Sequence, residues 1–309
     1  MVINVMMLRR GLLWGIAMLS AGIGLAQAAA LPGPLVTPQW LAANARVVTI
    51  LEIREDPNDY VASHIPGSRL VIAGQIRQTR KIDGRDVPAM LPDAAIIQSL
   101  MRSIGVRARQ PIVIVATGRT VEDFDGAARL YWTLKYYGAD ELAILDGGHA
   151  RWVAEGRATE SALPEQALGD WAATEPRAHL LADTTTVIQA SASGVQLVDA
   201  RPLAFFHGLT KRPVVDAYGH IPGSRVFPTE LRAKPEGSSQ RYLTIEDYRS
   251  ILQRLQIATD RPTITYCNTG HMGAGAWFIL SELVGNPQVS LYDGSMAEWA
   301  DGSRPVVRY

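Results

Sequence analysis

The stretch that decides the fold is Pro262–Leu280, which reads PTITYCNTGHMGAGAWFIL. Its β-branched opening, Thr263–Tyr266, predicts a short buried strand, and the spacing from Ala274 to Leu283 predicts an apolar helix. Between them lies a tight, glycine-containing loop that begins with Cys267, the only cysteine of the chain. We therefore expect this cysteine at the junction of a strand and a helix.

That position favours chemistry at the thiol of Cys267. The first turn of a helix carries backbone N–H groups that no helical carbonyl accepts. These donors and the positive end of the helix dipole favour an anion. The resident anion would be the thiolate, which is the nucleophilic form of cysteine. We predict that Cys267 is a catalytic nucleophile; the alternative is a buried cysteine that packs as a small hydrophobic residue.

The composition is that of a globular protein with room for two domains. The chain has 309 residues, of which 47% are hydrophobic and 19% are charged. Its 30 basic and 30 acidic side chains cancel. A protein without a strong positive field lacks the main attraction for nucleic acid, so no nucleic-acid partner is expected.

The beginning of the chain predicts export. Arg9 and Arg10 precede an apolar run, Gly11–Leu25, and an alanine-rich end before residue 31. This is the order of a signal peptide, and the run is shorter than the roughly 20 residues that span a membrane. We expect a signal peptide over residues 1–30, a periplasmic or secreted product without stable membrane insertion after cleavage, and either Sec or Tat export. A single cysteine in an oxidising compartment cannot form an internal disulfide, so it is either accidental or kept for chemistry.

From about Leu35 the chain repeats itself once. Four landmarks occur in the same order in both halves: a buried strand with an acidic residue two positions before an arginine, a His-Ile-Pro-Gly-Ser motif, a second buried strand, and an Asp-Gly turn followed by tryptophan. In the first copy they are Val47–Arg54, His64–Ser68, Pro111–Ala116 and Ile144–Trp152; in the second they are Val195–Arg201, His220–Ser224, Pro262–Cys267 and Leu291–Trp299. A repeat of this length predicts two whole domains rather than a solenoid.

Helical patterns alternate with these strands. The spacing predicts helices over Ala94–Ile104, Gly126–Tyr137 and Ile245–Leu255, the last with Thr244 as its N-cap. Alternating strands and helices favour a parallel α/β sheet, in which ligands bind beyond the carboxyl ends of the strands. Cys267 is expected at such an end.

Taken together, the motifs resemble the tandem-domain rhodanese family, the thiosulfate and 3-mercaptopyruvate sulfurtransferases, in an exported bacterial form. The resemblance extends from about residue 35 to residue 307 and rests on both His-Ile-Pro-Gly-Ser motifs, Val198–Arg201, Tyr266–His271 and Leu291–Trp299. It implies two rhodanese-like α/β domains, each a parallel sheet flanked by helices. The first, over residues 31–158, would be inactive because Ala116 stands in the place of Cys267. A linker over 159–178 and a catalytic domain over 179–309 would follow.

The resemblance also implies a reaction. The Cys267 thiolate would take the outer sulfur of a donor such as thiosulfate as a persulfide and pass it to a thiophilic acceptor such as cyanide or a thiol. The expected partners are therefore a small-molecule sulfur donor and acceptor, with a sulfur-accepting protein as a further candidate. No cofactor is implied, and the six histidines show no zinc-binding spacing, so no metal is expected.

The loop after the cysteine supplies most of the predicted substrate-binding residues, which are Arg201, Asn268, Thr269, Gly270, His271 and Met272. Backbone N–H groups of Asn268 to Met272 would stabilise the persulfide and the departing anion. Asn268 and Thr269 either orient substrate oxygens or only shape the loop. Gly270 would supply a backbone conformation that other residues resist. His271 either donates to an anionic substrate or points to solvent.

Arg201 corresponds to a family position that contacts the donor anion, and a guanidinium suits a sulfonate-like group. However, Arg54 occupies the same place in the copy that lacks a cysteine, so a structural ion pair with Asp199 is a serious alternative. By the same comparison, features that both copies share are assigned to the fold, which covers His64 with His220 and Asp146 with Asp293. Lys211 and Arg212, in a loop found only in the second copy, are interpreted as solvated.

Two other functions compete with sulfur transfer. A Cys-x5-Arg phosphatase or arsenate reductase would need an arginine where Gly273 stands, so it lacks its main charge partner. A non-catalytic persulfide carrier needs the same activated thiol and stays open. The donor is open too, because thiosulfate users often have basic residues after the cysteine and mercaptopyruvate users a small neutral loop, and this loop follows neither pattern. Thiosulfate is preferred for an exported enzyme.

Overall fold

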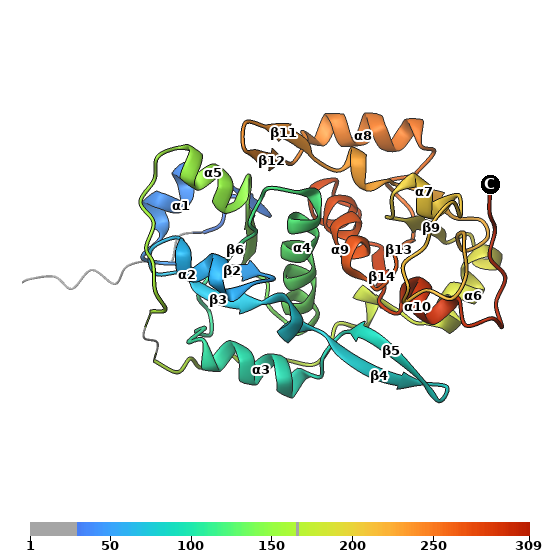
Figure 1. The fold of residues 1–309 in the computed structure, drawn as a ribbon, viewed down its shortest axis with the longest axis horizontal. Helices are drawn as coiled ribbons and strands as arrows, with labels where there is room; N and C mark the ends of the chain where they lie inside the picture. Colours follow the sequence, from blue (N-terminus) through green and yellow to red (C-terminus); the bar gives the residue numbers. More distant parts are fainter. Residues whose placement is uncertain (1–29, 165–166) are drawn as a thin grey trace, which may run out of the picture.

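The computed structural model describes residues 30–164 and 167–309. All but the last residue of the predicted signal peptide, and two residues of the predicted linker, lie outside this part of the chain. The described residues form two α/β domains that lie side by side (Figure 1). They contact each other mainly through one helix from each domain.

Each domain contains a five-stranded sheet in which all neighbouring strands are parallel. The first sheet has the order β1 (Leu35–Val36), β7 (Leu142–Leu145), β6 (Ile112–Val115), β2 (Thr49–Arg54), β3 (Arg69–Ile72), and the second has β8 (Leu181–Ala182), β14 (Val289–Tyr292), β13 (Thr263–Tyr266), β9 (Gln196–Asp199), β10 (Arg225–Val226). The second order repeats the first, strand for strand. This confirms the predicted α/β fold of two parallel sheets.

Helices flank both sheets. In the first domain they are α1 (Pro38–Asn44), α2 (Pro57–Ala62), α3 (Ala94–Ser103), α4 (Val121–Tyr136) and α5 (Gly148–Ala154). In the second they are α6 (Thr184–Ser193), α7 (Leu203–Phe206), α8 (Ile245–Arg254), α9 (His271–Phe278) and α10 (Ser295–Trp299). Short helical turns occur at η1 (Ala73–Ile76), η2 (Ala178–Leu180), η3 (Thr229–Leu231) and η4 (Ile279–Leu283), and each domain adds a hairpin, β4 (Gln78–Ile82) with β5 (Arg85–Met90) and β11 (Lys234–Glu236) with β12 (Ser239–Arg241).

The predicted strand Thr263–Tyr266 and the Thr244 cap of α8 are confirmed, the latter by a 3.1 Å hydrogen bond from the Asp247 amide to the Thr244 hydroxyl. Two helices begin earlier than their apolar spacing predicts. Helix α4 begins at Val121 because Thr120 and Asp123 form a reciprocal capping box. Helix α9 begins at His271 rather than Ala274, and its expected continuation through Leu283 is the π-helical turn η4.

Helices α4 and α9 form the centre of the interface between the domains (Figure 1). They approach so closely that a Cβ on Gly275 would lie 1.8 Å from Oδ1 of Asp125. Two buried ion pairs cross this interface from α4 to the second domain, Asp125 with Arg232 and Arg129 with Asp293. Breaking such a pair leaves one charge buried and uncompensated, so the pairs hold the domains in a fixed relation.

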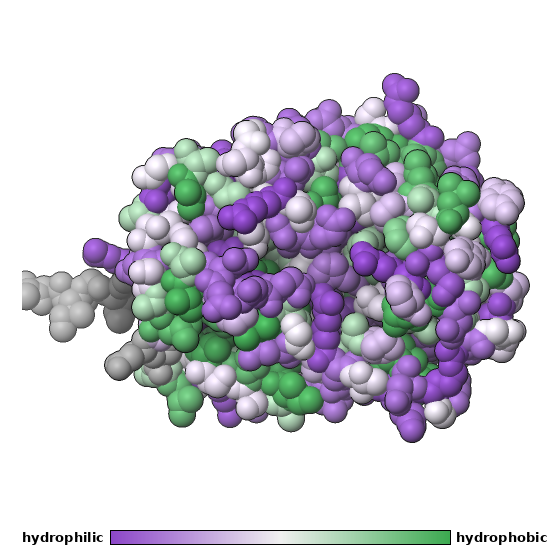
Figure 2. All heavy atoms as spheres, in the orientation of Figure 1, coloured by the Kyte–Doolittle hydropathy of each residue, from purple (hydrophilic) through white to green (hydrophobic). Residues whose placement is uncertain are grey.

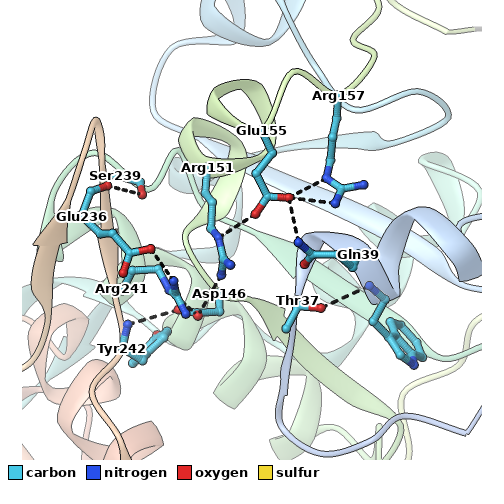
Figure 3. Close-up of polar contacts among 11 residues, drawn as sticks. Thr37, Gln39, Asp146, Arg151, Glu155, Arg157, Glu236, Ser239, Arg241 and Tyr242 are labelled. Carbon is cyan, nitrogen blue, oxygen red and sulfur yellow. Dashed lines mark hydrogen bonds and ion pairs between the residues drawn. The ribbon is translucent and has the colours of Figure 1, made fainter.

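Each domain's hairpin region contacts an aspartate of the other domain. Asp146, in the loop after β7, accepts hydrogen bonds from Arg241 Nε (2.6 Å) and the Tyr242 amide (3.2 Å) at the second-domain hairpin (Figure 3). Asp293, at the equivalent place after β14, accepts from the Leu91 amide (2.6 Å) at the end of the first-domain hairpin and from Arg129. The two matched aspartates therefore join the domains as well as shaping their own loops.

Within residues 30–164 and 167–309, no helix is long and apolar enough to cross a membrane.

Candidate active site

Cys267 follows the central strand β13 directly and lies under the beginning of α9. Its side chain is only 1% exposed, and it lines a cavity of about 310 Å³ between the domains. The first domain contributes Glu55, Arg77 and Glu122 to the walls, and the second contributes Arg212, Val214, Cys267, Asn268, Thr269, His271 and Met272. Figure 2 shows polar side chains gathered over the junction between the domains, in the middle of the view. The thiol is thus reached through a polar cavity rather than from the open surface.

The loop after Cys267 is held by the next strand-to-helix connection. Ser295 Oγ accepts the amides of Cys267 and Gly270, both at 3.0 Å, and donates to the Tyr292 carbonyl at 2.8 Å. The Met296 amide donates to the Cys267 carbonyl at 3.0 Å. Two amides and one carbonyl of the loop are therefore held by Ser295 and Met296.

Gly270 is required by its conformation and by its neighbours. Its φ of +75° lies in the left-handed region, where residues with a side chain are strained. A Cβ there would also lie 2.7 Å from Arg129 Nη1 and 2.8 Å from Asp293 Oδ1. The cross-domain pair Arg129–Asp293 thus packs directly against the loop that carries the cysteine.

Several amides of this loop keep their donors free. Among the residues that the structure describes, the backbone N–H groups of Asn268, Thr269, His271, Met272 and Gly273 make no hydrogen bond. Free amides at a helix N-terminus favour an anion in front of them. The loop can therefore stabilise negative charge next to Cys267 without any metal.

His271 connects the loop to the first domain. Its Nδ1 accepts a hydrogen bond from Arg77 Nη2, and its Nε2 lies 3.2 Å from the Glu122 carbonyl, to which it donates. Burial and the adjacent Arg77 guanidinium lower the pKa of His271 to about 3, so the ring is neutral at physiological pH. Both ring nitrogens are occupied, and the side chain bridges the domains rather than pointing to solvent.

Arg201 lies apart from the cavity. It is 1% exposed, donates from Nε (2.9 Å) and Nη2 (2.6 Å) to the Asp199 carboxylate, and donates from Nη2 to the Gly219 carbonyl at 2.8 Å. Its one contact with the loop is from Nη1 to Asn268 Oδ1, at 3.5 Å. Arg54 forms the matching ion pair with Glu52 and donates to Thr117 Oγ1 at 3.0 Å. The shared geometry favours a structural ion pair in both copies, with the Asn268 side chain positioned by Arg201.

The matched histidines also have equivalent surroundings. His64 Nδ1 lies 2.9 Å from the Tyr60 carbonyl and His220 Nδ1 lies 2.8 Å from the Phe206 carbonyl. Each ring stacks on the aromatic ring of the same partner. Both have structural contacts in the part of the chain that the structure describes.

Sequence reasoning missed the first-domain side of the cavity. Arg77, Glu55 and Glu122 stand about 150 to 210 positions before Cys267, and no local motif marks them. Arg212, which the sequence suggested was simply solvated, is exposed but lines the same cavity. In the described residues, no group of three or more histidine, cysteine, aspartate or glutamate side chains is arranged to hold a metal ion.

Comparisons with known proteins match both halves of the chain. The Rhodanese-like domain model matches residues 37–155 and again 184–301. A protein of Saccharopolyspora erythraea, provisionally named thiosulfate sulfurtransferase, is 28% identical over 86% of this chain and 92% of its own length. The sulfur carrier protein TtuD of Thermus thermophilus is 27% identical over 87% and 94%, respectively.

Solved structures have the same arrangement. SseA from Escherichia coli, described as one of the 3-mercaptopyruvate sulfotransferases, is 27% identical with a TM-score of 0.72 over 85% of this chain and 98% of that one. EanB in complex with ergothioneine has a TM-score of 0.77 over 89% of this chain and 70% of that one. At 20% identity, EanB shows a shared fold alone.

Proposed function

Because the chain belongs to the rhodanese family, whose domain model matches it twice, we propose that it is a sulfurtransferase working through a persulfide on Cys267. One observation supports this most directly: the single thiol lies at a cavity, beside loop amides that have no acceptor among the described residues. A site of this kind suits a reaction in which negative charge stays on or near sulfur throughout.

The first half-reaction is a displacement at sulfur. The Cys267 thiolate attacks the outer sulfur of thiosulfate, a new S–S bond forms, and the old S–S bond breaks with its electron pair leaving on sulfite. The products are a cysteine persulfide anion and sulfite, so charge is conserved. The amides of Asn268, Thr269, His271 and Met272 stabilise these anions, and Gly270 allows the chain to turn around the sulfur.

In the second half-reaction a thiophilic acceptor such as cyanide or a thiol attacks the outer persulfide sulfur and regenerates the Cys267 thiolate. The Cys267 sulfur serves first as nucleophile and then as leaving group, so no oxidant or reductant is consumed. The acceptor must enter the same cavity, because the thiol is reached only there.

Thiosulfate is the proposed donor, and the guanidinium groups of Arg77 and Arg212 on the cavity wall support an anionic one. The likeness to SseA favours 3-mercaptopyruvate as the alternative, whose carboxylate would suit the same groups. Steady-state rates with each donor, measured side by side, decide between them; equal failure of both would contradict the sulfurtransferase proposal.

The likeness to TtuD keeps a persulfide carrier as the second candidate. An enzyme forms thiocyanate from thiosulfate and cyanide over many turnovers, whereas a carrier stops after one equivalent. Cys267→Ser should abolish both the turnover and the gain of one sulfur that mass spectrometry detects on the wild-type protein. A variant that kept either property would place the chemistry elsewhere.

We also propose export, supported by the paired arginines and the short apolar run before residue 31. Expression of the full chain in a Gram-negative host, followed by N-terminal sequencing of the periplasmic fraction, should give a mature protein that begins near residue 29 or 31. Retention of the intact chain in the cytoplasm would contradict this.

A further inference from the structure

The active site needs a positive charge to bind an anionic donor, and the loop that carries Cys267 does not supply one. A dianionic donor has to be brought to a thiolate, yet Cys267–Met272 contains no lysine or arginine. The neighbouring buried guanidiniums are already paired with carboxylates, namely Arg201 with Asp199, Arg129 with Asp293 and Arg232 with Asp125. Positive charge for the donor must therefore come from another part of the cavity wall.

Arg77 of the first domain meets that requirement. It stands between η1 and β4 and lines the cavity together with Cys267. Among the described residues, its only hydrogen-bond partner is the neutral His271, and no carboxylate lies within ion-pair distance of its guanidinium. Burial and the nearby Arg129 guanidinium lower the pKa of Arg77 and outweigh the opposite influence of Glu55, Cys267 and Asp293, none of which forms an ion pair with it.

We propose that Arg77 binds the anionic group of the sulfur donor, so that the domain without a nucleophile supplies the donor-binding cation to the domain that has one. The ligand class is a small oxyanion, either the sulfonate-like end of thiosulfate or a carboxylate. His271 is the positioning residue: its Nδ1 holds one guanidinium nitrogen, which leaves the other N–H groups for the ligand.

Arg212 is the other cation on the cavity wall and forms no ion pair among the described residues. It is exposed, on the loop between α7 and the second His-Ile-Pro-Gly-Ser motif, so solvent screens its charge. The half-buried Arg77 is less screened and is held in place by a hydrogen bond. We therefore assign the larger share of donor binding to Arg77.

This assignment rests on the proposed function for the identity of the donor, but one test of it does not. Cys267 is alkylated in parallel with iodoacetate, an anion, and iodoacetamide, its neutral analogue. In the wild type the cavity cation favours the anion, and Arg77→Gln should lower the ratio of the iodoacetate to the iodoacetamide rate about tenfold. Arg77→Lys keeps the charge, so its ratio of iodoacetate to iodoacetamide rates should stay several-fold above that of Arg77→Gln.

The second readout is persulfide formation in a single turnover with thiosulfate. Arg77→Gln should slow it by about 10- to 100-fold, the effect expected for loss of a hydrogen bond to a charged group. Lys81→Gln is the matched control, since Lys81 is also a first-domain cation on β4 but its side chain is 71% exposed and does not line the cavity. It should change neither readout by more than about twofold.

The outcomes separate cleanly. An unchanged alkylation ratio in Arg77→Gln overturns the assignment, as does an equal loss in Lys81→Gln or a full loss in Arg77→Lys, which would point to packing rather than charge. If the ratio depends on Arg77 but the wild type never gains sulfur from any donor, the anion site stands and the proposed sulfurtransferase function fails.

Discussion

The two strand-to-helix loops of this molecule have the same scaffold but treat their amides differently. In the second domain the amides of Asn268, Thr269, His271 and Met272 make no hydrogen bond among the described residues, whereas the Gly270 amide donates to Ser295 Oγ. In the first domain the carboxylate of Asp123 accepts the amides of Arg119 (2.8 Å) and Thr120 (2.9 Å). Counted from Ala116 and Cys267, Thr120 matches His271, so Asp123 binds an amide of the first loop whose counterpart in the second makes no hydrogen bond among the described residues.

Both loops share one backbone contact with the next strand-to-helix connection. The His149 amide donates to the Ala116 carbonyl at 2.9 Å, as the Met296 amide does to the Cys267 carbonyl at 3.0 Å. The first copy thus differs from the second in three local features: the missing thiol, the amides bound by Asp123, and Gly148 in the place of Ser295, whose hydroxyl holds the second loop. We therefore expect that a nucleophile alone does not make this loop a catalytic site.

The largest expected effect tests that statement directly. In a Cys267→Ser background, where turnover should fall at least about 1,000-fold, Ala116→Cys should restore less than about 1% of wild-type thiocyanate formation, because Asp123 already occupies the amides. Ala116→Cys combined with Asp123→Asn should raise the rate above that of Ala116→Cys alone. Substantial activity from Ala116→Cys by itself would show that the occupied amides do not matter.

The next comparison is between the two matched aspartates. Asp293→Asn leaves Arg129 buried without a carboxylate, so it should lower the free energy of unfolding by about 3–5 kcal/mol and cut kcat/KM more than tenfold through the displaced Ser295 loop. Asp146→Asn affects partly exposed pairs and should cost about 1–2 kcal/mol with activity within twofold. Urea unfolding and thiosulfate kinetics of both variants measure this asymmetry; equal effects on activity would contradict it.

The matched arginines should behave alike. Arg201→Lys loses a forked contact with Asp199 and Arg54→Lys loses a single contact with Glu52, both buried carboxylates, and each should lower the unfolding free energy by about 1–3 kcal/mol. Because Arg201 does not line the cavity, the KM of the Arg201→Lys variant for thiosulfate should differ from that of the wild type by less than about threefold. A much larger rise of KM in Arg201→Lys alone would restore the interpretation that it contacts the donor.

The smallest effect is a pH dependence carried by one histidine in each domain. Burial lowers the pKa of His271 to about 3 and of His149 to about 4, so the unfolded chain binds these protons first as the pH falls below 6.5. Stability from both is fully present above pH 6.5 and is lost as the pH falls toward these values. Between pH 7 and pH 5, His271→Gln and His149→Gln should each lose about 1–2 kcal/mol less than the wild type in urea titrations. Parallel losses in wild type and variants would argue against neutral buried rings.

Features set by local pattern could be predicted from sequence. Strand β13 coincides with a mostly β-branched run, and the repeat by itself aligns Ala116 with Cys267. The start of α4 also has a local signal, the capping-box spacing of Thr120 and Asp123, which lies outside the apolar pattern that begins at Gly126.

Features set by docking of the domains could not be predicted. Arg77 is positioned by His271, which follows 194 positions later. No motif near Arg77 in the sequence indicates that it binds a ligand. Asp146 and Asp293 were correctly assigned to the fold, yet their partners lie in the other domain. Charge pairs between residues far apart in the chain leave no periodic pattern in the sequence that would reveal them.

The near-complete burial of Cys267, in the wall of a cavity of about 310 Å³, restricts what can collect the transferred atom. A folded acceptor with its thiol on a flat face would be stopped at the rim by its own bulk. Only a slender reagent, or a macromolecule that offers its thiol on a thin extended tail, has the shape to reach down and leave with the cargo.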